Sequence, residues 1–546
     1  MGKARFTVMI FGVLALLATL VAAPAQSGPT ATRPNIVYIM TDDLSSDIVP
    51  YMREVQAMIN EGVSFSNYIV SNTLCCPSRA GFLTGKYPQN NLVKTNVWPS
   101  GGFGKFFKND EQESVGVYLD NAGYRTGFLG KFLNQYQPKG NTGANGQPAY
   151  SPAYVPAGWD EAWLVDTGYQ QFAYTLTVGR DGVSSIKQFK GGAESNYLTD
   201  QLAGEAVDFI GRNAASPFFL TLTPTAVHNS PLGGDPERPY QYPPAPRDRP
   251  DSPTRPVGWS EPKFPLGGDC GTPVSGGCGE VVFPSNPDNY NKIIQNRPAW
   301  APSAPLGDAD VARHRRNYLD RVRMAQSVDD LIGDVRAALV AAGVADNTYV
   351  IFGSDNGYHL GEHAMNEDKG TPYDHDVRVP FIVVPPGGTT PRTQTELVSN
   401  VDLLPTFAGI AGVTSFAEPI DGRSMKSLIN SGAARSWRKS ALVQYDKMEL
   451  AAPRLDPDRV TSQAIIPTYR ALRTATYLYT DYGTLDSVPP KDHWTAEYYD
   501  LASDPAQVIN IYDRLPPERR AALNTALLDY ARCAGSSCRQ AGQVTP

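Results

Sequence analysis

The sequence predicts an α/β fold with a mostly parallel sheet, followed by a smaller antiparallel region. Continuous apolar runs of strand length, such as Asn35–Met40 and Phe218–Thr223, are typical of strands covered on both faces. Segments with helical apolar spacing, such as Tyr318–Ala342, alternate with these runs. Alternating strands and helices favour a parallel sheet flanked by helices. Near Ser436 the pattern changes to short strands in close succession.

The predicted elements follow from the same two periodicities along the chain. Each strand is a short, mainly apolar run, and each helix carries apolar residues three or four positions apart. The first region has predicted strands at 35–40, 63–70, 124–129, 218–223, 347–354 and 379–384 and predicted helices at 52–61, 78–84, 114–122, 198–212, 318–342 and 400–412. The second region has predicted strands at 441–445, 468–474, 477–482 and 497–501 and a predicted helix at 517–530.

The composition is that of a soluble globular protein. Of the 546 residues, 41% are hydrophobic and 19% are charged, and the formal net charge is -7. This balance gives no indication of a nucleic-acid partner. No segment after the first 25 residues is apolar enough to span a bilayer, so we expect no stable membrane insertion. The Pro- and Gly-rich segment 229–308 is expected to be an irregular excursion beside a strand end.

The N-terminus has the features of an export signal. Lys3 and Arg5 precede the uncharged apolar run Phe6–Ala22, and Ala23-Pro24-Ala25 is a small-residue cleavage site. We therefore expect a signal peptide over residues 1–25 and a secreted or extracytoplasmic protein. An uncleaved membrane anchor is the alternative, because the run of 17 residues lies at the short limit for a membrane span.

The six cysteines fit an exported protein. Cys533 and Cys538 surround a flexible Ala-Gly-Ser-Ser link, and Cys270 and Cys278 lie eight residues apart among Gly and Pro. Each pair could close a small disulfide loop. Zinc is a weaker alternative, because neither pair has the two-residue spacing of a zinc knuckle. Cys76 is left over and is expected to be buried.

Acidic and amide side chains follow two of the predicted buried strands. Asp42 and Asp43 end the first strand, and Asp355 and Asn356 follow the strand at 347–354. The carboxyl ends of strands are where α/β folds bind ligands. A set of oxygen ligands suits a hard cation, Ca²⁺ or Mg²⁺, and the anionic chelating character favours Ca²⁺. Taken separately, the first pair could be a helix cap and the second pair a turn.

The motif around which the chain is organised is Cys75-Cys76-Pro77-Ser78-Arg79, followed by Leu83-Thr84-Gly85. Pro77 suits the first helical position, and Gly85 is a natural helix end. Cys75 is therefore expected just before a helix N-terminus, where free N–H groups and the helix dipole favour an anion. Arg79 follows one turn later with a rigid fork for oxyanions. Two buried thiols ahead of an ordinary helix are the alternative.

This motif resembles the signature of the sulfatase family. In that family the first cysteine, here Cys75, is oxidised by a formylglycine-generating enzyme to Cα-formylglycine, whose hydrate supplies the attacking oxygen. The resemblance extends from Asn35 to about Gly542. It implies an alkaline-phosphatase-like catalytic domain over 34–435 and an antiparallel subdomain over 436–546. It also implies a metal site formed by Asp42, Asp43, Cys75, Asp355 and Asn356.

The resemblance assigns roles to four further side chains. Arg79 would contact the hydrate and support the metal-bound acids, and Lys131 would hold the hydrate. His228 and Lys369 would contact the sulfate, and either would protonate the leaving oxygen. His359 is a further predicted substrate contact. Many relatives have a histidine two residues after the lysine, where this chain has Leu133, so the group that assists sulfate release in those relatives is absent or replaced.

Two local patterns look like the N-acetylglucosamine-6-sulfatase branch of the family. They are Gly-Lys-Phe-Leu-Asn at 130–134 and the closing loop from Cys533 to Cys538. A sulfated small molecule or glycan, such as N-acetylglucosamine 6-sulfate, is therefore the predicted substrate. Phosphonate monoester and phosphodiester hydrolases share the architecture and are an alternative. Another is a non-catalytic binder of sulfated glycans in which Cys75 is never oxidised.

Overall fold

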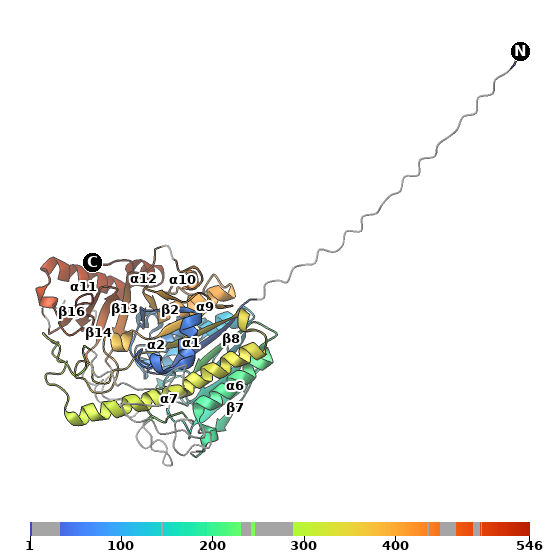
Figure 1. Cartoon of the computed structure of the whole chain (residues 1–546), viewed down its shortest axis with the longest axis horizontal. Helices are drawn as coiled ribbons and strands as arrows, with labels where there is room; N and C mark the ends of the chain where they lie inside the picture. The colour runs from blue at the N-terminus through green and yellow to red at the C-terminus, as the bar shows by residue number, and fades with distance from the viewer. Residues whose placement is uncertain are drawn as a thin grey trace. The chain divides into compact units, whose positions relative to one another are not determined.

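A mixed sheet of ten strands lies at the centre of the described part of the protein (Figure 1). The computed structural model describes residues 1–2, 33–143, 146–166, 169–191, 193–230, 242–245, 288–433, 436–447, 466–483, 492 and 494–546. Within these residues the strand order is β11-β2-β10-β9-β1-β8-β4-β5-β6-β7. Residues Arg33–Pro546 form one unit.

The middle of this sheet is parallel. Neighbouring strands run in the same direction from β9 through β1, β8 and β4 to β5. β10 and the β6–β7 hairpin are antiparallel to their neighbours, and that hairpin was not predicted. The predicted α/β fold is confirmed. The strands are β1 (Asn35–Thr41), β2 (Val63–Phe65), β4 (Arg125–Lys131), β5 (Glu161–Val165), β6 (Thr175–Arg180), β7 (Val183–Gln188), β8 (Phe218–Thr223), β9 (Thr348–Ser354), β10 (Phe381–Val384) and β11 (Arg392–Gln394).

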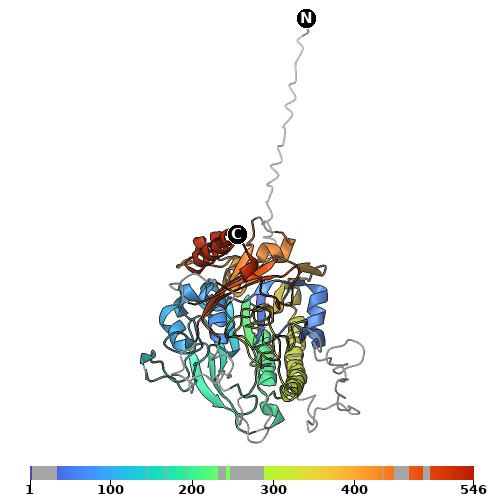
Figure 2. The ribbon, with the colours of Figure 1, turned by 90° about the vertical axis from the view of Figure 1, so that its left-hand side faces the viewer.

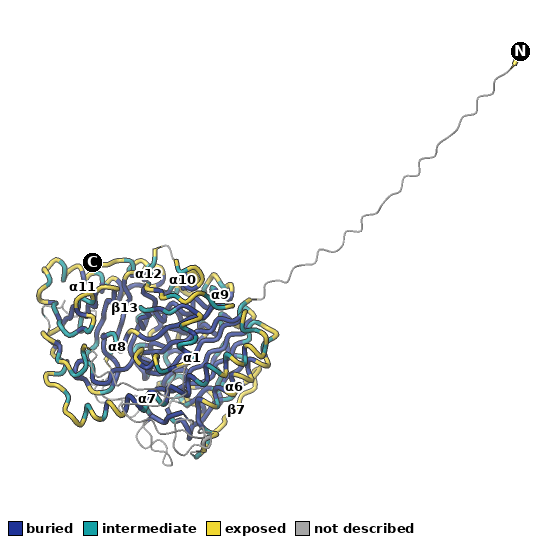
Figure 3. Tube along the Cα trace, viewed as in Figure 1, coloured by how far each residue is buried: buried dark blue, intermediate teal, exposed yellow. Residues whose placement is uncertain are grey.

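Helices cover both faces of the sheet, because its strands are apolar on both sides. Along β1, Ile36 and Tyr38 enter one hydrophobic core, whereas Val37 and Ile39 enter the other. Figure 3 shows these strands buried and the outer helix surfaces exposed. One core includes α2 (Cys75–Thr84), α4 (Gly102–Asn109), α5 (Val115–Asn121) and α9 (Leu403–Ala411). The other includes α1 (Arg53–Glu61), α6 (Leu198–Asn213) and α7 (Asp308–Ala341), which lie side by side in Figure 1.

The predicted C-terminal antiparallel sheet is confirmed. Its strands are β13 (Ser440–Tyr445), β14 (Tyr469–Thr474), β15 (Tyr477–Tyr482) and β16 (Ala496–Asp500), paired in that order. Leu523 and Leu527 of α11 (Pro517–Ala531) pack with Leu442 and Leu472 of this sheet. Figure 2 shows the red C-terminal helices beside the orange and red strands of the sheet. The boundary at residue 436 stays a prediction. The remaining elements are β3 (Tyr68–Ile69), β12 (Val398–Ser399), α3 (Pro88–Asn91), α8 (Asp374–Val377), α10 (Lys426–Ser431) and α12 (Ser536–Ala541).

The cysteine predictions have different outcomes. Cys533 and Cys538 form the predicted disulfide, and their Cα atoms lie 4.8 Å apart. Cys76 is buried, as expected. Cys270 and Cys278, the signal peptide and most of segment 229–308 lie outside the described residues. Among the residues that are described, we find no helix with the length and apolar character needed to cross a membrane.

A buried ion pair joins the start of β13 to the start of α9. Both terminal nitrogens of Arg438 donate to the carboxylate of Asp402 at 2.6 Å, and the two side chains are 2% and 0% exposed. The same carboxylate accepts the backbone N–H of Ser399 at 2.9 Å. Loss of the arginine would therefore leave a buried charge without its main partner.

We predict that Arg438→Met lowers the free energy of unfolding by about 3–5 kcal/mol, because it leaves the buried Asp402 carboxylate without its charged partner. Urea denaturation measures the change. Arg336→Met is the matched control, since Arg336 pairs with Glu61 at 2.6 Å where both side chains are partly exposed, and it should cost less than about 1 kcal/mol. Equal losses in the two variants would contradict the prediction.

Candidate active site

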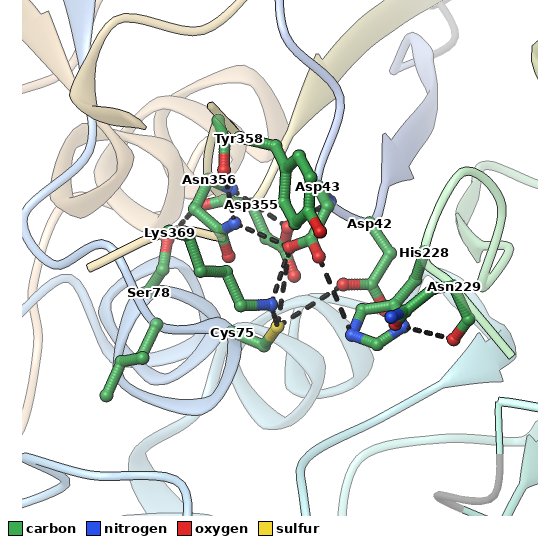
Figure 4. A network of polar contacts seen from close by, with 12 residues as sticks. Asp42, Asp43, Cys75, Ser78, His228, Asn229, Asp355, Asn356, Tyr358 and Lys369 are labelled. Atoms are coloured by element: carbon green, nitrogen blue, oxygen red, sulfur yellow. Dashed lines mark hydrogen bonds and ion pairs between the residues drawn. The ribbon is translucent and has the colours of Figure 1, made fainter. Parts of the chain in front are cut away.

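Polar side chains from five elements meet at the carboxyl edge of the parallel strands (Figure 4). Neighbouring parallel strands end at the same edge, so residues far apart in the sequence become adjacent. β1, β4, β8 and β9 contribute residues at or just beyond their ends, and α2 contributes its first residue. These residues are Asp42, Asp43, Cys75, Lys131, His228, Asp355 and Asn356. Figure 4 labels all of them except Lys131.

Cys75 occupies the first turn of α2. The helix begins at Cys75 itself, with Leu74 as its N-cap. The prediction that Pro77 opens the helix and that the thiol precedes it was therefore wrong by two positions. The extended backbone of Leu74 lets the helix start there, and Pro77 takes the third position, where its missing N–H still costs no intrahelical bond. Gly85 ends the helix with a φ of 66°, as predicted.

The Cys75 thiol lies among two acids and a lysine. Its Sγ is 3.3 Å from Asp42 Oδ1, 3.9 Å from Asp43 Oδ1 and 2.9 Å from Lys369 Nζ. Lys369 also donates to Asp43 Oδ1 at 2.6 Å. Figure 4 shows Lys369 reaching across the site toward both groups. The structure therefore brings together four residues that are spread over more than half of the sequence.

The guanidinium group of Arg79 contacts two of the acids. Its Nε donates to Asp355 Oδ2 at 2.7 Å, its Nη2 lies 3.4 Å from Asp42 Oδ2, and its Nη1 donates to the carbonyl of Lys131 at 2.5 Å. Burial alone would lower the pKa of Arg79, but Asp355 and Asp42 outweigh it and the pKa is raised. The guanidinium therefore remains charged and ties three strand ends together.

The acids of this site have different electrostatic surroundings. Burial raises the pKa of Asp355, and the neighbouring Asp42 adds to this effect. For Asp42, burial also acts upward, but Lys131 and Arg79 hold its pKa below the ordinary value. Lys131 Nζ donates to Asp42 Oδ2 at 2.7 Å. Gly130 permits this placement, because at its φ of 122° a Cβ would lie 2.1 Å from the carbonyl oxygen of Thr223.

The oxygens of the acids and of Asn356 are the ligands that a hard divalent cation prefers, and a sulfur and an imidazole nitrogen lie beside them. Asp42, Asp43, Cys75 and His228 each offer a ligand atom, and these atoms lie within 4.8 Å of one another. Asn356 Nδ2 donates to Asp43 Oδ1 at 2.6 Å, while its buried Oδ1 has no hydrogen-bond partner among the described residues. An orphaned amide oxygen beside carboxylates is what Ca²⁺ or Mg²⁺ would satisfy.

His228 is oriented from two sides. Its Nδ1–H donates to the carbonyl of Asn229 at 2.7 Å, and its Nε2 lies 3.5 Å from Asp43 Oδ2. The imidazole stacks on Tyr169 with ring centroids 3.9 Å apart. Lys131 Nζ lies 4.3 Å from the centroid of the same tyrosine ring. Tyr169 was not predicted, since an aromatic residue in a loop carries no pattern that marks it as functional.

Leu133 does not replace the missing histidine. Its side chain is fully buried in the hydrophobic core, as is that of Phe132. The next residue, Asn134, donates from Nδ2 to the hydroxyl of Tyr169 at 3.0 Å. The segment after Lys131 therefore supports Tyr169 and places no titratable side chain of its own at residue 133.

Arg321 is a second residue that sequence reasoning missed. It lies in the middle of α7 with no exposed surface, and it donates to the backbone carbonyls of Asp43 and Val227. Its guanidinium carbon is 4.3 Å from the Tyr358 ring centroid. It thus joins the loop that carries the acids to the loop that carries His228. A single arginine at a core position of a long helix was the only available signal.

His359 lies in a separate group of side chains. Its Nδ1 is 3.1 Å from both carboxylate oxygens of Asp376. Its predicted contact with substrate is untested and stays a prediction.

The comparison with known proteins decides the family. The profile described as "Sulfatase" matches residues 34–413, and the profile described as "N-sulphoglucosamine sulphohydrolase, C-terminal" matches residues 361–529.

The chain belongs to the sulfatase family.

Among curated relatives, this sulfatase is 29% identical to human N-acetylglucosamine-6-sulfatase over 535 residues, which cover 94% of this chain and 87% of the relative. A solved structure in complex with its substrate D-glucosamine-2-N,6-O-disulfate is 22% identical, with a TM-score of 0.62 and coverage of 91% and 97%. The phosphonate monoester hydrolase of Agrobacterium radiobacter is 20% identical, with a TM-score of 0.61 and coverage of 93% and 96%. Both likenesses support the alkaline-phosphatase-like fold.

We predict that Arg321→Met lowers kcat of this sulfatase by about 10–100-fold, because misplacing a reacting group by an ångström has an effect of this size. Steady-state kinetics on an aryl sulfate measure it. Arg323→Met is the control, since Arg323 lies on the same helix and pairs with the partly exposed Asp320 at 3.5 Å. The role assigned to Arg321 is wrong if both variants keep wild-type kcat.

We also predict that Tyr169→Leu lowers kcat/KM by about 5–30-fold, because stacking and cation–π contacts contribute about 1–2 kcal/mol. Tyr169→Phe keeps the ring and should stay within about threefold of wild type. The pH dependence of kcat/KM should shift in the leucine variant, since His228 loses its aromatic partner. Identical behaviour of the two variants would show that the ring has no such role.

Proposed function

We propose that this sulfatase is an exported enzyme that hydrolyses the sulfate ester of a sulfated sugar, with N-acetylglucosamine 6-sulfate as the first candidate. The observation that carries the proposal is the position of residue 75, between the acids Asp42 and Asp43 and the ammonium group of Lys369. This arrangement offers a nucleophile, a cation site and positive charge in one place. Those are the requirements for cleaving a sulfate ester.

Residue 75 is the proposed nucleophile after a formylglycine-generating enzyme has converted its thiol to Cα-formylglycine. The hydrated aldehyde supplies one hydroxyl that attacks sulfur and a second that allows the sulfate to leave. Sγ of Cys75 stands in for the reacting oxygen in this geometry. The first turn of α2 stabilises negative charge there, because its backbone N–H groups have no intrahelical partners.

Asp42, Asp43, Asp355 and Asn356 would hold the divalent cation, Ca²⁺ or Mg²⁺. When bound, it supplies Lewis-acid stabilisation of developing negative charge. Arg79 keeps two of these acids in place by pairing with Asp355 and Asp42. The fit rests on the oxygen ligands and on Asn356 Oδ1, which has no hydrogen-bond partner in the described part of the chain.

The remaining side chains neutralise the sulfate and protonate the leaving alcohol. Lys131, Lys369 and His228 surround the same acids from different sides. Lys369 is the first candidate for the proton donor, since its Nζ lies 2.9 Å from Cys75 Sγ. His228 is the second, because its Nδ1–H is held by a backbone carbonyl and only Nε2 remains to exchange a proton.

The name of the human relative and the D-glucosamine-2-N,6-O-disulfate substrate of the solved neighbour support a sulfated sugar as substrate. Export is supported by the charged start, apolar run and small-residue site of the first 25 residues. The phosphonate monoester hydrolase neighbour favours one rival, an enzyme that prefers phosphonate monoesters or phosphodiesters. A non-catalytic binder of sulfated glycans is the other.

The test begins with protein produced together with a formylglycine-generating enzyme. We predict that the peptide spanning residues 68–86 has lost two hydrogens and a sulfur and gained an oxygen, as mass spectrometry would show. Cys75→Ala should lower kcat on N-acetylglucosamine 6-sulfate by at least about 10³-fold, as expected when a covalent nucleophile is removed. Cys76→Ala, at the neighbouring buried thiol, should retain activity.

Rates on matched sulfate and phosphodiester esters separate the rival enzymes. If the enzyme strongly prefers the phosphodiester, the proposed sulfate-ester substrate is wrong. An active preparation with unmodified Cys75 would rule out the proposed nucleophile. Binding of sulfated sugar without turnover, by modified protein, would favour the non-catalytic reading.

A further inference from the structure

Residues 357–377 form the loop that carries Lys369, and its two ends lie against each other. The backbone N–H of His359 donates to the carbonyl of Asp368 at 2.8 Å, and the reverse bond is 3.1 Å. The N–H of Gly357 donates to the carbonyl of Asp376 at 2.9 Å. We call this segment the Lys369 loop. Its closure decides where the ammonium group that contacts Cys75 lies.

Three imidazoles gather inside the Lys369 loop. The ring centroids of His359 and His375 are 5.3 Å apart, and those of His363 and His375 are 5.4 Å apart. His359 is 1% and His363 0% exposed, and the side chain of His375 is 10% exposed. Three such rings in one buried place have no part in the mechanism proposed above.

Several of these ring nitrogens lack hydrogen-bond partners within the described part of the chain. They are Nε2 of His359, both nitrogens of His363 and Nδ1 of His375. Burying a polar atom without a partner is costly, so such atoms mark this part of the core as polar. They are not the atoms that lie near Asp376, which are Nδ1 of His359 and Nε2 of His375.

Two of the rings and one carboxylate present donor atoms to a common point. His359, His375 and Asp376 each offer one atom, and the three atoms lie within 4.8 Å of one another. Asp376 Oδ1 is 3.1 Å from His359 Nδ1 and 3.9 Å from His375 Nε2. Donors on a tetrahedral Zn²⁺, with bonds of about 2.0–2.1 Å, lie roughly 3.3 Å apart. Small side-chain movements would therefore complete the geometry.

We propose that His359, His375 and Asp376 form a site for a transition-metal ion of the Zn²⁺ type, separate from the catalytic cation. Imidazole nitrogens with a carboxylate favour Zn²⁺ over Ca²⁺, in contrast to the oxygen-rich catalytic set. The ion joins residues at both ends of the Lys369 loop and so holds Lys369 in its place beside Cys75.

The surroundings of the triad suit an ion. Thr371 donates to Asp376 Oδ2 from its backbone N–H at 2.9 Å and from its hydroxyl at 2.7 Å. Oδ1 lies 3.1 Å from His359 Nδ1, and both atoms become metal ligands when His359 carries its proton on Nε2. Thr371 Oγ1 also lies 3.4 Å from His375 Nε2. His375 lines a cavity of about 340 Å³ that Asp47 and Glu362 also line, so an ion can approach the triad from this side.

The test measures zinc directly, so its outcome is independent of the proposed substrate. The full chain is stripped with EDTA, dialysed against Zn²⁺ with excess Ca²⁺, and analysed by elemental mass spectrometry and titration calorimetry. A Cys75→Ala background removes the thiol from the catalytic donors, which could otherwise bind zinc. We expect one tightly bound Zn²⁺ per chain in both backgrounds, and visible d–d absorption after Co²⁺ substitution.

His359→Gln and His375→Gln should each weaken zinc binding by at least about 100-fold, and Thr371→Val should weaken it by about 10-fold. His314→Gln is the matched control, since His314 is buried, pairs with Glu367 at 2.8 Å and lies outside the triad. It should keep full zinc binding. If His359→Gln fails to fold, His375→Gln and Thr371→Val still decide the matter.

Zinc should also raise the melting temperature of wild type and His314→Gln but not of His375→Gln. The absence of a retained zinc ion in wild type would overturn the proposal. Zinc binding that is unchanged in His375→Gln would overturn it equally. Loss of zinc with unchanged substrate preference would leave the proposed function standing, so the two can fail separately.

Discussion

The active site depends on a balance of buried charges. Asp42, Asp43 and Asp355 are within 1% of full burial, and isolated carboxylates would be very costly there. Arg79, Lys131 and Lys369 supply the compensating positive charge through contacts of 2.6–3.4 Å. Removing one partner of such a pair is strongly destabilising, so the network holds its members in one arrangement. The site is thereby organised before any substrate arrives.

The parallel part of the sheet makes this balance possible. β4, β8, β1 and β9 are consecutive neighbours in the sheet, and each delivers a polar residue at the same edge. α2 starts at that edge, so its N-terminal N–H groups and its Arg79 face the same point from the opposite side. Antiparallel strands lie only outside this block, where they extend the sheet without contributing acids to the site. Architecture and chemistry are therefore linked through strand direction.

Two further residues, Arg321 and Tyr169, act by positioning other groups of the site. Arg321 binds backbone carbonyls, and Tyr169 offers the faces of its ring. Arg321 donates to carbonyls in two separate loops, and Tyr169 supports both an imidazole and an ammonium group. Neither side chain is an acid, a base or a nucleophile in the proposed chemistry. Their importance lies in where they hold Asp43, His228 and Lys131. The Lys369 loop completes the enclosure, since it brings its lysine to Cys75 from beyond β9.

The sequence by itself determined the fold class, most of the core elements and the identity of the chemical groups. Strands such as Phe218–Thr223 were predicted to the residue, because a continuous apolar run between turn signals has a clear local cause. The cysteine motif and the strand-end acids were visible for a similar reason, since their neighbours in sequence carry the signal.

Only the tertiary structure decided which groups touch. Tyr169, Arg321 and the histidines of the Lys369 loop acquire their roles from partners remote in the sequence, and short-range periodicity carries no information about such contacts. The exposed strand β7 escaped prediction because it buries no side chain that would impose a pattern.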